Sequence, residues 1–177
     1  SGDKPALSQS SRSKRHTEVA DQLVEKGAAY RCYLNDTELQ ILRDECLTTG
    51  SALRSPWRER DLGGKSDQPF TIRMKMPSDG NTTVNDVVQG TVTIQNKVLD
   101  DMVILRSDRS PTYMLAVVVD DHDMGVTHVI RGDDHLNNAF RQLMIYLGMG
   151  WQAPVFAHIP LIHGTDGTKM SKRHGAL

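Results

Sequence analysis

The chain has 177 residues, of which 38% are hydrophobic and 24% charged, and its 21 basic and 22 acidic side chains leave a formal net charge of −1. This length can bury a sizeable core and corresponds to one domain or two small ones, while the balanced charge excludes a bulk cationic field for nucleic acid. The sequence shows no apolar run long enough to span a membrane and no apolar signal-peptide core, so a cytoplasmic protein is predicted.

The first elements are predicted from the spacing of apolar residues. Residues 1–9 are polar and are expected to form a loop. Helical spacing from about Ser11 to Lys26 predicts a helix, with Gly27 as its C-terminal stop. Residues 28–33 are predicted to form a short strand.

A second helix is predicted between Thr37 and Gly50. Thr37 and Gln40 have the spacing of a capping box, and glycine is favoured just after a helix. Cys46 lies on the apolar face of this helix and is therefore interpreted as a small core residue rather than a reactive thiol.

Short strands follow a loop predicted over residues 51–68. Between Phe70 and Met76 apolar and polar side chains alternate, which is typical of a half-buried strand. Further short strands are predicted over Val84–Val88, Val92–Ile94 and Met102–Leu105. Residues 32–110 are therefore predicted to form a small α+β unit with antiparallel strands.

From Thr112 onward the pattern changes to a parallel α/β unit. The predicted elements are a buried strand over Val126–Arg131, a helix over 133–147 that Gly148 closes, and a strand over Val155–Ile162. Short links between them imply two parallel strands with a right-handed crossover. Ligands of such sheets bind beyond the carboxyl ends of the strands, so Arg131 and the loop after Ile162 are expected to open onto one crevice.

That loop concentrates positive charge. It begins with an Asp166-Gly167 turn and then carries two lysines and an arginine around a small hydroxyl, in the order Lys169, Ser171, Lys172 and Arg173. Two ammonium groups and a guanidinium suit a polyphosphate, whose negative charge increases as it leaves. Composition alone leaves a solvated basic loop as the alternative.

The order Lys169-Met170-Ser171-Lys172-Arg173 resembles the second ATP-binding motif of class I aminoacyl-tRNA synthetases. The next residues, His174-Gly175-Ala176, are similar to the form found in bacterial-type glutamyl-tRNA synthetases. Further runs fit the same family in the same order, namely Gln9–Arg12, Tyr113–Asp121, Gly125–His135 and Ala157–Ile162. The resemblance extends over essentially the whole chain.

The resemblance implies an α/β fold with a partial, Rossmann-like class I synthetase core, of which the second half is present. An α+β connecting insertion with antiparallel strands would interrupt this core. Residues 1–31 are then the remnant of the first half, residues 32–110 the insertion that holds the tRNA acceptor end, and residues 111–177 the second half. Tyr113–Asp121 is implied to be a short helix, although its β-branched residues favour a strand.

The resemblance also implies an amino-acid pocket. Arg131 would bind the carboxylate of a glutamate substrate, Tyr113 would line the pocket, and Ser10 would lie at its rim. From the residues alone, the alternatives are an ion pair of Arg131 with Asp133 or Asp134, packing for Tyr113 and helix capping for Ser10.

The resemblance implies an ATP site that combines the cationic loop with two other positions. Asp134 would accept hydrogen bonds from the ribose, and the backbone at Leu161 would face the adenine, with helix capping and core packing as the alternatives. Lys172 is expected to stabilise the phosphates, next to Ser171. The catalytic residues of the loop are predicted to be Lys169, Lys172 and Arg173.

ATP with Mg²⁺ is therefore expected, but no structural metal. Acidic and imidazole side chains are dense between Asp120 and His135, yet they lack a helical His pair or a Cys/His cluster. Some members of the family hold zinc in the insertion through a Cys-x-Cys pair and further ligands. Here Cys32 is followed by Leu34 at the second position, and residues 51–68 contain neither Cys nor His, so no zinc is predicted.

The predicted function is that of a monomeric glutamate–tRNA ligase, which activates L-glutamate with ATP to glutamyl-adenylate and transfers it to the 3′ end of tRNA(Glu) in protein biosynthesis. The His-rich first motif of class I enzymes is not found, because His16 stands alone, so a central fragment that is inactive by itself is expected. The alternatives are a paralogue that glutamylates a modified base of tRNA(Asp), a glutaminyl-tRNA synthetase, a non-catalytic tRNA-binding fragment and a metal-dependent phosphoesterase.

Overall fold

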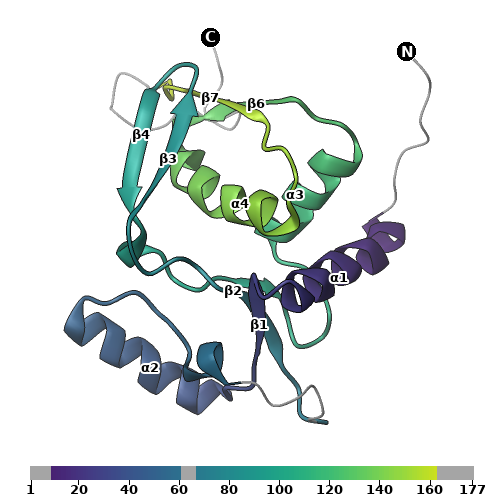
Figure 1. The fold of residues 1–177 in the computed structure, drawn as a ribbon, viewed down its shortest axis with the longest axis vertical. Coiled ribbons are helices and arrows are strands. Elements are labelled where there is room, and N and C mark those ends of the chain that lie inside the picture. Colours follow the sequence, from purple (N-terminus) through teal and green to yellow (C-terminus); the bar gives the residue numbers. More distant parts are fainter. Residues whose placement is uncertain (1–8, 61–66, 163–177) are drawn as a thin grey trace.

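The computed structural model describes residues 9–60 and 67–162, with side chains from residue 12 onward (Figure 1). Within these ranges the strands form two sheets. The first is antiparallel and has the order β1 (Ala29–Cys32), β2 (Thr71–Met74) and β5 (Val103–Leu105). The second has the order β4 (Gly90–Gln95), β3 (Asn81–Asp86), β7 (Val155–Ile159) and β6 (His128–Gly132).

The second sheet contains the predicted parallel unit. β6 and β7 are parallel and are connected by α4 (Leu136–Met149), which confirms the expected strand, helix and strand. The antiparallel hairpin β3–β4 joins the same sheet, because Asp86 pairs with Phe156 and the Val87 N–H donates to the Phe156 carbonyl at 2.9 Å. The strands of residues 32–110 are thus distributed over both sheets, and their assignment to one insertion stays a prediction.

Three helices cover the sheets and enclose the core. α1 (Gln9–Glu25) and α3 (Tyr113–Asp123) pack with α4, and Figure 1 shows α3 and α4 next to the second sheet. The helical state of α3 confirms the expectation from the resemblance over the strand propensity. Apolar side chains buried between these helices and the first sheet form the main core, including Val19, Leu23, Ile72, Leu115, Val118 and Ile145. A smaller cluster between α4 and the second sheet contains Val84, Ala139, Phe140 and Phe156.

The second helix differs from its prediction at its start and in its burial. α2 spans Asp36–Thr49, and its capping box is formed by Asn35 and Glu38, each accepting the other's backbone N–H at 2.9 Å, so the predicted box at Thr37 and Gln40 is wrong. Its end at Gly50, which has φ +64°, is confirmed. No α2 residue is buried and Cys46 is half-buried, so its interpretation as a core residue is also wrong.

The fourth helix and the strand before it also correct the sequence analysis. α4 begins at Leu136, after a 3-10 turn, continues through Gly148 and ends before Gly150, which has φ +71°. A Cβ on Gly148 would lie 2.8 Å from Leu23 Cδ2 and 2.9 Å from Ala28 Cβ, so this glycine permits close packing rather than ending the helix. β6 is not the predicted buried strand, because it lies at the sheet edge with Ile130 66% exposed.

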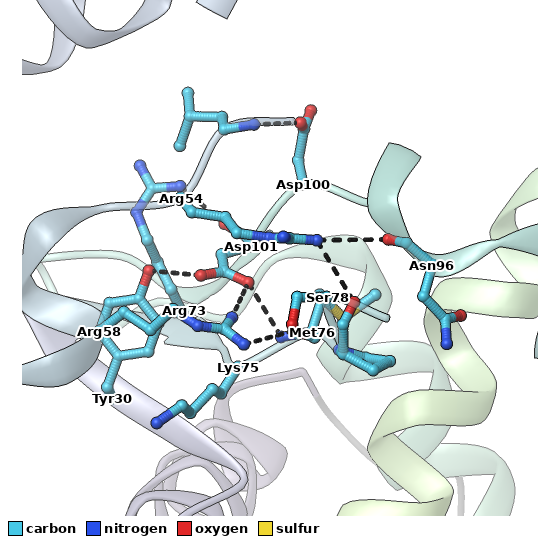
Figure 2. Close-up of polar contacts among 12 residues, drawn as sticks. Tyr30, Arg54, Arg58, Arg73, Lys75, Met76, Ser78, Asn96, Asp100 and Asp101 are labelled. Atoms are coloured by element: carbon cyan, nitrogen blue, oxygen red, sulfur yellow. Dashed lines mark hydrogen bonds and ion pairs between the residues drawn. The ribbon is translucent and has the colours of Figure 1, made fainter. Parts of the chain in front are cut away.

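A buried carboxylate connects the first sheet to the segments around it (Figure 2). Asp101 is fully buried and accepts hydrogen bonds from Tyr30 Oη at 2.9 Å, Arg58 Nη1 at 2.7 Å and the Met76 N–H at 2.9 Å. Its main-chain oxygen accepts from Arg73 Nη1 at 2.8 Å. The predicted alternation puts Arg73 on the exposed side of its strand, but the side chain is buried because it reaches this carbonyl. None of the described helices is long and apolar enough to cross a membrane.

Candidate amino-acid and nucleotide site

Arg131 lies near the carboxyl end of β6, on the face that α4 covers. In the register of the two parallel strands Arg131 is opposite His158, so their side chains lie on the same face. Arg131 Nε donates to His158 Nε2 at 3.0 Å, and Nη2 donates to Gln142 Oε1 at 3.0 Å and to the His135 carbonyl at 3.4 Å. The guanidinium also lies 5.6 Å from the centre of the Phe156 ring. The side chain is therefore held by uncharged groups.

These contacts test the alternative that Arg131 forms an ion pair with a neighbouring aspartate. Among the described residues, no carboxylate forms an ion pair with Arg131, so pairing with Asp133 or Asp134 is not supported. Burial lowers the pKa of the Arg131 guanidinium, and the nearby Tyr113 and Asp121 side chains act in the opposite direction. A half-buried cation without a bonded anion is suited to bind a carboxylate ligand.

Two tyrosines and an aspartate lie around Arg131. Tyr113, the first residue of α3, is 52% exposed and close enough to Arg131 to affect its pKa, so the structure brings these two predicted residues together. Burial and the charge of Asp121 raise the pKa of Tyr146 to about 12. Burial and the neighbouring Asp120 raise the pKa of Asp121, which the charge of Arg131 opposes.

Sequence reasoning missed the residues that support Arg131. Asp86 and His158 are fully buried, with Asp86 Oδ2 and His158 Nδ1 2.5 Å apart, and Gln142 is 2% exposed. Burial would raise the pKa of Asp86, but hydrogen bonds from the Gln89 N–H, the His158 ring and other backbone N–H groups lower it to about 2. His158 shares the inward face of β7 with Phe156, whereas the apolar Val155 and Ile159 point outward, so the sequence pattern contained no signal for it.

Two of the predicted ATP-binding residues lie next to each other. A Cβ built on Gly132 would be 2.6 Å from Asp134 Oδ1 and 2.8 Å from Leu161 Cδ2. Both side chains therefore lie over the same glycine at the end of β6, one residue after Arg131. The absence of a side chain at Gly132 allows this close approach. The predicted amino-acid and ribose contacts thus come from one strand end.

The remaining predicted site residues lie outside the described part of the structure. They are the side chain of Ser10 in the first turn of α1, and Lys169, Ser171, Lys172 and Arg173 of the cationic loop.

The acidic end of α3 is used for ion pairs with α1. Arg12 Nε donates to Asp120 at 2.9 Å and Arg12 Nη2 to Asp123 at 2.5 Å, while Arg15 also bonds Asp123 and His16 Nε2 lies 2.8 Å from Asp120. Burial by itself would lower the pKa of the Arg12 guanidinium, but the hydrogen bonds to Asp123 and Asp120 raise that pKa overall. These contacts hold α1 against α3.

The described residues contain no group of three or more Cys, His, Asp or Glu side chains placed to hold a metal ion. Cys32, the first position of the zinc motif considered above, is buried with its Sγ 3.3 Å from Ser55 Oγ.

Comparison with known proteins identifies similar chains along nearly the whole sequence. A family model described as tRNA synthetases class I (E and Q), catalytic domain, matches residues 2–177. Glutamate–tRNA ligase 1 of Cereibacter sphaeroides is 60% identical over 177 residues, which is 99% of this chain and 38% of the relative. Glutamate–tRNA ligase of Phenylobacterium zucineum is 56% identical over 174 residues, which is 98% of this chain and 37% of the relative.

A solved structure is also similar. The crystal structure of a glutamate tRNA ligase from Elizabethkingia meningosepticum, in complex with its amino acid, superposes with a TM-score of 0.83 at 33% identity. The match covers 97% of this chain and 37% of that one. The chain thus spans well under half the length of the relatives that it matches.

Proposed function

The chain belongs to the class I tRNA synthetases (E and Q), and from this premise we propose that it is the central part of a glutamate–tRNA ligase. Membership in the family confirms the resemblance found in the motifs and the Rossmann-like fold class. In the proposed reaction, ATP and L-glutamate form glutamyl-adenylate and pyrophosphate, and the glutamyl group is then transferred to the 3′ end of tRNA(Glu). ATP enters as a substrate with Mg²⁺.

One observation carries the proposal. Arg131 presents a half-buried guanidinium at a strand end, and the groups bonded to it among the described residues are all uncharged. A glutamate carboxylate would supply an anion for this guanidinium, with Tyr113 beside it. Charge-assisted hydrogen bonds of this kind are worth about 1.5–3 kcal/mol each.

The other parts of the proposed mechanism concern position and charge. The Asp134 side chain would face the ribose and the backbone at Leu161 the adenine, and the side chains of both residues lie over Gly132. Lys169, Lys172 and Arg173 would neutralise the charge that develops on the leaving pyrophosphate. The enzyme would therefore accelerate the attack of the glutamate carboxylate on the α-phosphate of ATP without forming a covalent bond between substrate and enzyme.

The test is pyrophosphate exchange by the whole ligase with Arg131→Gln. We expect the KM for glutamate to rise at least about 10-fold, because the substituted amide is neutral and lacks the guanidinium fork. Arg141→Gln is the matched control, since Arg141 lies on α4 and bonds only the Asn137 carbonyl among the described residues. An unchanged KM for glutamate in Arg131→Gln contradicts the proposal.

The activity of the chain by itself is a separate proposal. We expect no glutamate- and ATP-dependent pyrophosphate exchange from the 177-residue chain, because the sequence lacks the His-rich first motif. Detectable exchange would contradict this expectation. A cytoplasmic monomer is proposed for the whole ligase, and sedimentation measurements test the oligomeric state.

A further inference from the structure

Two hydrogen bonds in series connect Arg131 to the β3–β4 hairpin, the first half-buried and the second buried. His158 Nε2 lies 3.0 Å from Arg131 Nε, and His158 Nδ1 lies 2.5 Å from Asp86 Oδ2. The side chains of Asp86 and His158 are both 0% exposed. The three residues come from β3, β7 and β6, three neighbouring strands of the second sheet.

The donors and acceptors along this series of hydrogen bonds specify one protonation state for His158. A guanidinium can only donate, so Nε2 must be the acceptor for the Arg131 Nε–H. The ring proton therefore resides on Nδ1, from which it is donated to the Asp86 carboxylate. A neutral His158 with the proton on Nδ1 is the form that satisfies both contacts.

Backbone N–H groups orient the Asp86 carboxylate. Oδ1 accepts from the Val88 and Gln89 N–H groups, both at 2.9 Å, and the His158 N–H is shared between Oδ1 at 3.1 Å and Oδ2 at 3.0 Å. The pairing of β3 with β7 ends at Asp86, so its carboxylate takes the place of the next main-chain acceptor for His158. Oδ2 is thereby directed at the imidazole.

Three bonds of Arg131 use Nε and Nη2, and a side-chain hydrogen bond with Tyr113 also acts on the guanidinium. Nε donates to His158, and Nη2 donates to Gln142 and to the His135 carbonyl, so Nη1 takes no part in these three contacts among the described residues. Fixing Nε therefore fixes the direction in which Nη1 is presented to a ligand.

We propose that Asp86 and His158 are positioning residues that hold the Arg131 guanidinium in the orientation that receives the glutamate carboxylate. This inference rests on the proposed function for the role of Arg131. Asp86 acts through two intervening residues by selecting the tautomer of His158, and His158 acts by accepting the Arg131 Nε–H.

Asp86→Asn is the diagnostic substitution. The Val88 and Gln89 N–H groups bond only Oδ1 and require an acceptor, so they retain the amide oxygen at the position of Oδ1 and direct the amide nitrogen at His158 Nδ1. Nδ1 must then accept, the ring proton moves to Nε2, and an N–H faces the Arg131 Nε–H. An Asp→Asn change beside a catalytic histidine of serine proteases produces the wrong tautomer in the same way.

The first measurement is the ¹⁵N spectrum of histidine side chains in the 177-residue chain. We expect a protonated Nδ1 and an unprotonated Nε2 for His158, and the reverse in Asp86→Asn. Asp79→Asn, the same chemical change at an exposed position before β3, should leave the spectrum unchanged. A His158 with its proton on Nε2 in the unsubstituted chain overturns the inference, whatever the substrate of the enzyme.

The second measurement is pyrophosphate exchange by the whole ligase. Asp86→Asn should raise the KM for glutamate about 10- to 100-fold, the range expected for a lost hydrogen bond to a charged group, and change the KM for ATP less than about twofold. A reversed tautomer with an unchanged KM for glutamate overturns the positioning role. If Arg131→Gln also leaves that KM unchanged, the proposed function fails as well.

A pair of substitutions at His158 keeps the inference testable if Asp86→Asn does not fold. His158→Gln retains an amide oxygen that can accept from Arg131, whereas His158→Phe retains an aromatic ring beside Phe156 without an acceptor. We expect the KM for glutamate to rise in both variants and to be about 10-fold higher in His158→Phe than in His158→Gln. Equal increases in two variants of equal Tm overturn the inference.

Discussion

The buried carboxylate of Asp101 provides a stability prediction whose size follows from its contacts (Figure 2). In Asp101→Asn the Met76 N–H, which can only donate, keeps the amide oxygen in place, and Arg58 shares that oxygen. The amide nitrogen then faces the Tyr30 hydroxyl, which can turn to accept. The hydrogen bonds are thus retained, but the charge opposite Arg58 is lost.

The expected loss of stability is intermediate. Breaking a buried ion pair costs about 3–5 kcal/mol. Arg58 is 13% exposed and retains a 2.7 Å bond to the Met76 carbonyl and a contact with Glu59, so we expect about 2–3 kcal/mol for Asp101→Asn. Tyr30→Phe removes one hydrogen bond and leaves the ion pair, so about 1.5 kcal/mol is expected.

The assay is urea unfolding of the chain followed by circular dichroism, analysed as a two-state transition. Asp100→Asn is the control, because the exposed Asp100 accepts only the Leu53 N–H among the described residues, and should cost less than about 1 kcal/mol. The double variant Tyr30→Phe/Asp101→Asn should deviate from additivity by about 0.5 kcal/mol or more, since both changes affect one network. An Asp101→Asn chain as stable as the Asp100→Asn chain would refute the reasoning.

Three further predictions concern glycines and pH. Gly148→Ala should destabilise the chain by about 1–2 kcal/mol in urea unfolding, because overpacking against Leu23 and Ala28 outweighs the gain in helix propensity; a stabilised variant would contradict this. Gly132→Ala should raise the KM of the whole ligase for ATP several-fold at little cost in stability, because Asp134 Oδ1 and Leu161 Cδ2 must move, and an unchanged KM would argue against their role. Folding lowers the pKa of Asp86 from 3.8 to about 2, so the ionised Asp86 contributes about 2 kcal/mol to the free energy of unfolding above pH 4. This contribution is lost as the pH falls towards 2. Unfolding free energies between pH 5 and pH 2 should therefore decrease more steeply in the unsubstituted chain than in Asp86→Asn.

The sequence predicted the local elements best where periodicity was strong. The order of β6, α4 and β7, and the position of Arg131 at a strand end, followed from apolar spacing and short links. The helical state of α3 followed only from the resemblance, because its run of valines favours a strand in isolation. Packing of Leu115, Val118 and Val119 into the core explains why the helix forms nonetheless.

Errors arose where two local signals competed. Asn35 and Thr37 are both favourable N-caps, and the choice depends on which side chain meets a suitable residue three positions later. Gly148 and Gly150 both fit a helix end, and contact with Leu23 and Ala28 decides that Gly148 stays inside the helix.

By itself, the sequence determined which family this chain resembles, where most of its helices and strands occur and that Arg131 lies near a strand end. These properties depend on neighbouring residues, whose spacing along the chain is visible. Only the tertiary structure decided that the β3–β4 hairpin joins the sheet of Arg131 and that Asp86, 72 residues before His158, contacts its ring. The pairing of strands so distant in sequence is set by the packing of complete sheets and helices, which no local pattern contains.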